Sequence, residues 1–291
     1  MKKKIFISFI FISFIFILPI KAQNSYKGKV ISNNNPLEYA SVINKTMGVN
    51  QYTDKGGLFS IETLSNTDTL QIQCIGYVSK EIPLLNKPHE LVIELEQNSE
   101  LLNEVVISIN NNEKGKWKKV NRKTKRFDST YQGLAEGYNI ISTYKIQEEI
   151  KFNGIRFFIM TNTLNKDLTV NNNFYKKVRP ILIINSDQLD NNILPNKIIY
   201  LNKDADLFTK LDIEFTNTLH LQSGETLTIG LELMPENLEK PNINNVLGIL
   251  TTKHLLKESK TYLTNLFSKK QGNLHDSPLN EDLYFELKVV K

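Results

Sequence analysis

The stretch 52–61, which reads Tyr-Thr-Asp-Lys-Gly-Gly-Leu-Phe-Ser-Ile, constrains the fold more than any other part of the chain. Gly56 and Gly57 lack a Cβ atom, so the backbone can adopt a positive φ there and reverse its direction. After the turn, Phe59 and Ile61 alternate with their neighbours, a period that is typical of a strand with one buried face. The stretch therefore predicts a β-hairpin at the centre of an all-β fold.

The first 22 residues have the pattern of a secretory signal peptide. Three lysines follow Met1, an almost unbroken apolar run covers residues 5–18, and the small Ala22 precedes Gln23. The apolar run is shorter than the ~20 residues that a membrane span needs. We therefore expect residues 1–22 to be removed, leaving an exported chain without a transmembrane span. An uncleaved anchor is the alternative.

The charge of the chain is unevenly distributed. Removal of residues 1–22 takes away four lysines and no acid, so the formal net charge falls from +5 to +1. Within residues 114–126 there are eight Lys and Arg residues and no acid, which leaves the remainder of the mature chain acidic. The basic segment would fit an anionic partner, but the export signal argues against nucleic acid.

Residues 26–109 read as short strands separated by turn residues. The expected strands are 26–31, 37–43, 58–62, 69–75, 77–83 and 91–95. Their spacing favours a small antiparallel sandwich, with Val92 or Ile93 facing inward in the last strand. Cys74 is the only cysteine, so no internal disulfide can form, and its apolar neighbours predict a buried side chain.

Four motifs in this region resemble, in order, the carboxypeptidase-like regulatory domain. They are Gly28-Lys29-Val30, Pro36-Leu37-Glu38-Tyr39-Ala40-Ser41-Val42, Thr53-Asp54-Lys55-Gly56-Gly57-Leu58-Phe59-Ser60-Ile61 and Ile75-Gly76-Tyr77. The resemblance implies a transthyretin-like Greek-key sandwich over residues 23–108. It also implies no catalytic activity, because this domain is the non-catalytic appendage of certain zinc carboxypeptidases. The family occurs in exported Gram-negative envelope proteins, which implies a location in the periplasm, in the outer membrane or at the cell surface.

A second similarity concerns the end of this domain. Residues 101–107 are similar to the segment that joins the same domain to the plug of TonB-dependent transporters. The ~180 residues that follow are too few for the strands of such a barrel. The similarity therefore implies an accessory of a TonB-dependent transport system, with partner contacts through Glu104, Val105, Val106 and Ile107.

We interpret residues 109–136 as a basic linker, because they show neither strand alternation nor a continuous apolar face. The alternative is an electrostatic contact with an anionic envelope surface. The side chains expected to make that contact are Lys118, Lys119, Arg122, Lys123 and Arg126.

The alternating pattern returns over residues 137–291. The expected strands are 138–144, 150–161, 178–185, 197–201, 211–215, 227–233, 246–250 and 283–290, and the longest irregular stretch is 253–282. Antiparallel strands of this number and length predict a larger jelly-roll-like sandwich. This part also loosely resembles jelly-roll modules of exported proteins.

No catalytic residues are assigned from the sequence. The four histidines lie in no zinc-binding frame, and no Gly-x-Ser-x-Gly nucleophile turn is present. Asp212 and Glu214 share one strand face and are the carboxylate pair that a polysaccharide hydrolase would need.

Calcium binding is the one metal hypothesis that the sequence raises. Asn202, Asp204 and Asp206 alternate as in the start of a calcium loop. The pattern then fails, because leucine occupies the position of the sharp-turn glycine at 207. A polar turn is therefore the preferred interpretation, and we expect no cofactor.

Tyr262 and Phe267, in the predicted irregular stretch, are the aromatic pair expected to stack on a glycan. The sequence as a whole predicts an exported, non-catalytic binding or scaffolding protein of the envelope that recognises a protein or a glycan. A polysaccharide hydrolase and an accessory of TonB-dependent transport are the alternatives.

Overall fold

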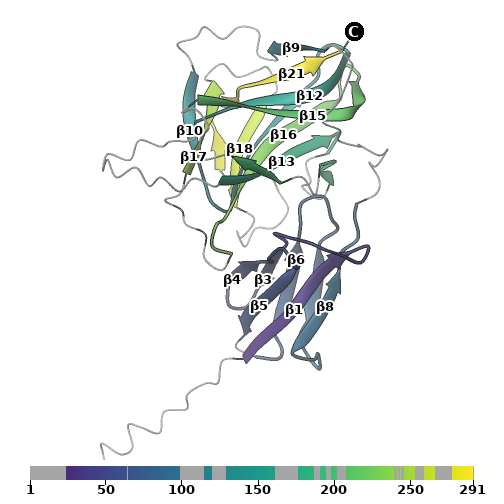
Figure 1. Cartoon of the computed structure of the whole chain (residues 1–291), viewed down its shortest axis with the longest axis vertical. Coiled ribbons are helices and arrows are strands. Elements are labelled where there is room, and N and C mark those ends of the chain that lie inside the picture. Colours follow the sequence, from purple (N-terminus) through teal and green to yellow (C-terminus); the bar gives the residue numbers. More distant parts are fainter. Residues whose placement is uncertain are drawn as a thin grey trace, which may run out of the picture.

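The computed structural model shows an all-β protein whose strands form two domains (Figure 1). It describes residues 24–63, 65–98, 115–119, 129–160, 176–186, 191–194, 198–201, 208–238, 241, 243, 246–252, 259–265 and 277–290. The all-β prediction is confirmed. No helix in the described part of the chain is long and apolar enough to cross a membrane.

The first domain is a sandwich of two four-stranded sheets. One sheet contains β1, β2, β5 and β8, and the other runs in the order β4, β3, β6, β7. The strands are β1 (Asn24–Ser32), β2 (Asn35–Pro36), β3 (Ser41–Asn44), β4 (Val49–Tyr52), β5 (Leu58–Thr63), β6 (Thr69–Gln73), β7 (Lys80–Pro83) and β8 (Glu90–Glu94). One pair, β1 with β8, is parallel, although the sequence analysis expected an antiparallel sandwich.

The glycine turn connects the two sheets, so the hairpin prediction is wrong. β4 pairs with β3 in one sheet, whereas β5 pairs with β1 in the other. Asp54 shapes the turn, because its Oδ1 accepts hydrogen bonds of 2.8 Å from the backbone N–H groups of Gly56 and Leu58. Gly57 adopts a φ of 73° and its carbonyl accepts a 2.8 Å hydrogen bond from Val30. The turn therefore carries the chain across the sandwich.

The core of the first domain follows the predicted alternation. Residues along β5 alternate between exposed and buried, with Phe59 and Ile61 inside. In β8, Ile93 is buried and Val92 is 73% exposed. Of the two residues that the sequence analysis considered, Ile93 is therefore the one that faces inward. Cys74 lies in the same core, as predicted. Burial of these apolar side chains stabilises the domain without a disulfide.

The second domain is a larger sandwich. One sheet joins β10, β17, β12, β21 and β9 in order, with β15 beside β12 and β20 beside β17, and the other runs β14, β13, β16, β11, β18, β19. The strands are β9 (Lys116–Lys119), β10 (Ser129–Ala135), β11 (Tyr138–Lys145), β12 (Ile150–Met160), β13 (Lys176–Ile184), β14 (Ile199–Leu201), β15 (Phe208–Leu221), β16 (Thr226–Met234), β17 (Val246–Thr252), β18 (Lys260–Asn265), β19 (Ser277–Leu279), β20 (Asp282–Leu283) and β21 (Phe285–Val289). Within the described residues, these strands all pair antiparallel, as expected.

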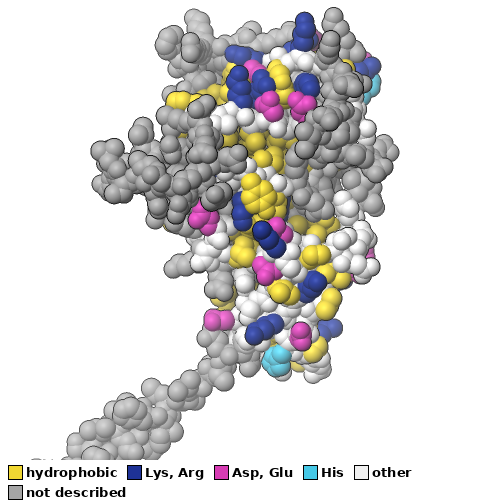
Figure 2. Space-filling model, in the orientation of Figure 1, with side chains coloured by type: hydrophobic (Ala, Val, Ile, Leu, Met, Phe, Trp, Pro, Cys, Tyr) yellow, Lys and Arg dark blue, Asp and Glu magenta, His cyan; other side chains and the backbone are white. Residues whose placement is uncertain are grey.

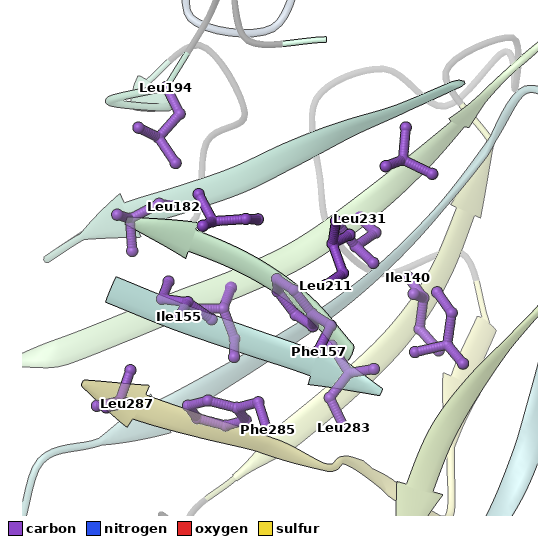
Figure 3. Close-up of a cluster of buried hydrophobic side chains, with 14 of the residues drawn as sticks. Ile140, Ile155, Phe157, Leu182, Leu194, Leu211, Leu231, Leu283, Phe285 and Leu287 are labelled. Atoms are coloured by element: carbon purple, nitrogen blue, oxygen red, sulfur yellow. The ribbon is translucent and has the colours of Figure 1, made fainter. Parts of the chain in front are cut away.

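Two stretches of the predicted linker belong to this sandwich. β9 pairs with β21 along the edge of one sheet, and β10 pairs with β17 over seven residues. The linker interpretation of residues 109–136 therefore does not hold for them. The sheets enclose one apolar core, in which Figure 3 shows Phe157, Phe285 and Leu231 between the strands.

The outer face of one sheet of the second domain packs against the first domain. β16 is buried on both sides, because its leucines and Ile229 face the core while Glu232 and Met234 face the first domain. Ile75, in the Ile-Gly-Tyr motif, packs with four side chains of the second domain: Ile141, Ile181, Ile183 and Tyr262. The two sandwiches therefore share a buried apolar contact.

A buried ion pair lies in the same interface. Arg179 on β13 and Glu232 on β16 are 1% and 0% exposed, and their Nη1 and Oε2 atoms are 3.1 Å apart. The second nitrogen of Arg179 donates a 3.2 Å hydrogen bond to the carbonyl of Tyr39, and the hydroxyl of Tyr52 lies 3.4 Å from Glu232. Burial raises the pKa of Glu232, and the charge of Arg179 opposes that increase. The first domain thus contributes two hydrogen-bonding groups to a charge pair that the second domain buries, while Arg179 Nε has no partner among the described residues.

Candidate functional site

The predicted carboxylate pair lies on the open outer face of the second domain. Asp212 accepts two hydrogen bonds from Arg156, of 2.6 and 2.7 Å, and these bonds raise the pKa of the guanidinium. Glu214 Oε2 is 2.9 Å from Lys288 Nζ. Figure 2 shows such charges gathered where Figure 1 labels β9, β12, β15 and β21. Because Asp212 pairs with Arg156 and Glu214 pairs with Lys288, the geometry favours a cross-strand charge network over acid and base catalysis.

The predicted glycan-stacking tyrosine is part of the domain interface. Tyr262 lies on β18 rather than in an irregular loop, is 8% exposed, and packs among isoleucines. It therefore offers no ring face to a glycan, and that interpretation is corrected. Phe267, its predicted partner, lies outside the described residues.

Several other predicted site residues also lie outside the described part. These are the calcium candidates Asn202, Asp204 and Asp206, and the partner-contact residues Glu104, Val105, Val106, Ile107, Arg122, Lys123 and Arg126. Within the described part, no group of three or more His, Cys, Asp or Glu side chains could hold a metal ion.

Lys118 and Lys119, from the same predicted contact set, line a pocket of about 610 Å³. The pocket lies beside the edge strand β9, between the end of β21 and the connection from β11 to β12. In Figure 1, β9 and β21 lie at the end of the second domain that is farthest from β1 and β8. The pocket is therefore remote from the domain interface, and its volume is within the ~300–1,000 Å³ of typical ligand sites.

The floor of the pocket is apolar. Tyr144, Ile146 and Leu287 belong to the buried core of the second domain, and the partly buried Ile150 and Val289 pack against that core. The hydroxyl of Tyr144 donates a 2.9 Å hydrogen bond to the carbonyl of Leu283, so its polar atom is satisfied away from the pocket. The floor thus extends the hydrophobic core toward the surface.

The charged side chains of the pocket are mostly basic. Four lysines and two glutamates line it: Lys118, Lys119, Lys145, Lys151, Glu148 and Glu149. Glu149 Oε1 lies 2.6 Å from His220 Nε2, so part of the acidic charge has a partner on β15. Within the described residues, neither Lys118 nor Lys151 forms an ion pair. The arrangement can hold an anion.

The sequence analysis missed the second side of this pocket. Residues 144–151 read Tyr-Lys-Ile-Gln-Glu-Glu-Ile-Lys, which looks like a polar turn between two strands. Lys145 and Lys151 flank that turn, but only the sheet pairing places them near β9. The one sequence signal for this side of the pocket was the pair of lysines, Lys145 and Lys151, on either side of the turn.

Lys176 is a buried titratable group outside the pocket. Its side chain is 3% exposed on β13, and its ammonium donates a hydrogen bond to the carbonyl of Val246. Burial lowers the pKa of Lys176 to about 8, although the carboxylates of Glu136 and Glu236 oppose the decrease. A lowered lysine pKa is one mark of a reactive amine, but Lys176 does not line the pocket described above. We interpret it as a structural cation.

The lowered pKa of Lys176 predicts a pH dependence of stability. An unfolded lysine titrates near ~10.4, so between pH ~8 and ~10.4 the unfolded state binds more protons and the folded state gains stability as the pH rises. From pH 7 to about pH 9.5 we expect wild type to gain about 1–2 kcal/mol relative to Lys176→Met. Urea unfolding of both proteins across this range measures the gain. A difference in free energy that stays constant with pH would contradict it.

Comparison with known proteins finds a family match by sequence for the first domain. No curated protein matches the chain. The structure is similar to DUF3823 family proteins from Parabacteroides merdae ATCC 43184 (10% identity, TM-score 0.21, 73% of this chain and 98% of that chain) and Bacteroides ovatus ATCC 8483 (9%, 0.22, 73% and 98%). It is also similar to a proposed carbohydrate binding protein from Bacteroides uniformis ATCC 8492 (11%, 0.21, 72% and 99%). At these TM-scores the matches do not establish a shared overall fold. Residues 26–107, which form the first sandwich, match the family model of the CarboxypepD_reg-like domain.

Proposed function

We propose that the protein is an exported, non-catalytic binding protein of the cell envelope that holds an anionic partner at the basic pocket of its second domain. The observation that carries the proposal is the pocket of about 610 Å³ with an apolar floor and a rim of four lysines. Concave sites with an apolar lining and a few charged groups are where proteins most often bind ligands. The CarboxypepD_reg-like domain supports a binding role rather than a catalytic one.

The proposed location rests on the first 22 residues. The lysines before the apolar run and the small residue before Gln23 are typical of a secretory signal. The mature chain would then meet the polyanions and proteins of the periplasm or of the outer surface. A partner with phosphate, carboxylate or sulfate groups complements the lysine rim.

Site-directed photo-crosslinking in cells tests this function. A photoreactive residue at position 147, an uncharged position in the lining of the pocket, is expected to give one reproducible adduct in the envelope fraction. The matched control carries the same residue at position 29, on β1 of the first domain, and should not give that adduct. Lys118→Gln/Lys151→Gln should reduce the yield at position 147, because these lysines line the pocket without lying at the crosslinker. The same adduct from both positions, or none in the envelope fraction, would count against the proposal.

A further inference from the structure

The floor and rim of the pocket differ in chemistry, and together they specify a class of ligand. We propose that the pocket binds a single-chain amphipathic anion, in which an aliphatic group enters the floor and a phosphate or carboxylate meets the lysines. This inference rests on the proposed function and adds the apolar half of the ligand. An anion alone would need only the rim.

The apolar half follows from where the floor lies. Leu287 is 1% exposed and Ile146 is 8% exposed, and both belong to the main core of the second domain. Ile150 and Val289 are only partly buried and pack against that core. An aliphatic chain that covers them would remove further apolar surface from water, as core packing does.

The anionic half follows from the two sides of the rim. Lys118 and Lys119 come from β9, whereas Lys145 and Lys151 come from the end of β11 and the start of β12. Lys118 pairs with the buried Leu287 and so shares its face of the sheet, whereas Lys119 Nζ lies 5.4 Å from the ring centroid of Tyr284. We therefore expect Lys118, with Lys145 and Lys151, to meet the anion, and Lys119 to add positive charge beside them. The hydrogen bonds between an ammonium and an anion are stronger than those between neutral groups.

A glycan is less well matched to this pocket. Sugar rings stack on exposed aromatic faces, and the aromatic residue among the lining side chains is Tyr144. Its side chain is 1% exposed and its hydroxyl already donates to Leu283. A saccharide would therefore find charge at the rim but neither a stacking face nor a free hydroxyl on the floor.

A homologous series of n-alkyl phosphates, from ethyl to octyl, tests the inference. Binding to the mature two-domain protein is measured by isothermal titration calorimetry below the micellar concentration of each compound. Burying one methylene is worth about 0.8 kcal/mol, so each methylene that enters the floor should tighten binding about fourfold until the floor is filled. Glucose 6-phosphate, with the same anion on a polar body, should bind more weakly than butyl phosphate.

Two variants separate the halves of the site. Lys118→Gln/Lys119→Gln should weaken every member of the series by about tenfold, because it removes charged donors. Val289→Thr should weaken octyl phosphate about fivefold while leaving ethyl phosphate unchanged, since a hydroxyl on the floor opposes only the chain. Val92→Thr, at an exposed position of the first domain, is the matched control and should change neither.

The outcomes distinguish this inference from the proposed function. Affinity that rises with chain length and falls in both pocket variants supports it. Affinity that is flat along the series but lost in Lys118→Gln/Lys119→Gln overturns the amphipathic ligand and leaves an anion site. Failure of every phosphate to bind, with all variants folded by circular dichroism, overturns the inference and counts against an anion site in this pocket.

Discussion

Replacing Arg179 with methionine is expected to lower the free energy of unfolding by about 3–5 kcal/mol, because it leaves Glu232 buried without its charge partner. Glu232 is 0% exposed, and among the described residues only the 3.4 Å contact from the hydroxyl of Tyr52 to its carboxylate would remain. The carbonyl of Tyr39 would also lose its donor. The effect should reach both domains, since the pair lies where they meet.

Urea unfolding followed by two signals measures this effect. Trp117 is the only tryptophan, so its fluorescence reports on the second domain, whereas far-ultraviolet circular dichroism reports on both. The control is Arg179→Met/Glu232→Leu, which removes both charges and should recover most of the loss, because apolar replacements of a buried pair are often neutral. A single variant that unfolds like wild type, or a double variant that is less stable than the single one, would contradict the account.

Replacing Gly57 with alanine is expected to cost about 2–4 kcal/mol, because a side chain there meets both strain and a clash. Its φ is 73°, and a Cβ atom would lie 2.4 Å from the carbonyl oxygen of Val30. That carbonyl accepts a hydrogen bond from Leu37, so it cannot move away freely. The substitution therefore strains the turn that links the two sheets of the first domain.

The neighbouring glycine provides the control for this prediction. At Gly56, a Cβ atom would lie no closer than 3.3 Å to Asp54, and no positive φ is required. Gly56→Ala should therefore change the free energy of unfolding by less than about 1 kcal/mol. Thermal or urea unfolding of both variants measures the two losses in the free energy of unfolding. Equal losses at positions 56 and 57 would show that the two glycines are needed for some other reason.

The first domain was largely predictable because its signals are local. The motifs around Gly57 and Ile75 lie in the stretch that matches the CarboxypepD_reg-like family model, and the alternation along β5 gives the buried face correctly. The pairing partner of β5 was not predictable in this way. A turn with two glycines is compatible with a hairpin and with a crossing between sheets. The pairing of β4 with β3 in one sheet and of β5 with β1 in the other makes it a crossing.

The second domain shows where local patterns are insufficient. Most of its long strands alternate visibly, but β9 is four residues long and rich in lysine, so it reads as a linker. β16 is buried on both faces, because the first domain covers the side that carries Glu232. Nothing local in the sequence indicates that Arg179 would lie opposite Glu232, because only the register between β13 and β16 pairs the two residues.

The candidate site was predicted only in part. Lys118 and Lys119 were identified from charge alone, whereas the floor residues are ordinary strand positions whose exposure depends on where the sheet ends. Asp212 and Glu214 show the opposite case, since their shared strand face suggested catalysis and their pairing with Arg156 and Lys288 supports a structural role.

The most direct test of the binding site is amide hydrogen exchange of the two-domain protein with and without saturating hexyl phosphate, followed by mass spectrometry of its peptides. We predict slower exchange in peptides that cover residues 116–119 and 144–151, which line the pocket from its two sides. Exchange in β1 to β8 should be unchanged. Protection confined to the first domain, or to the outer face formed by β12 and β15 with none at residues 144–151, would contradict the account.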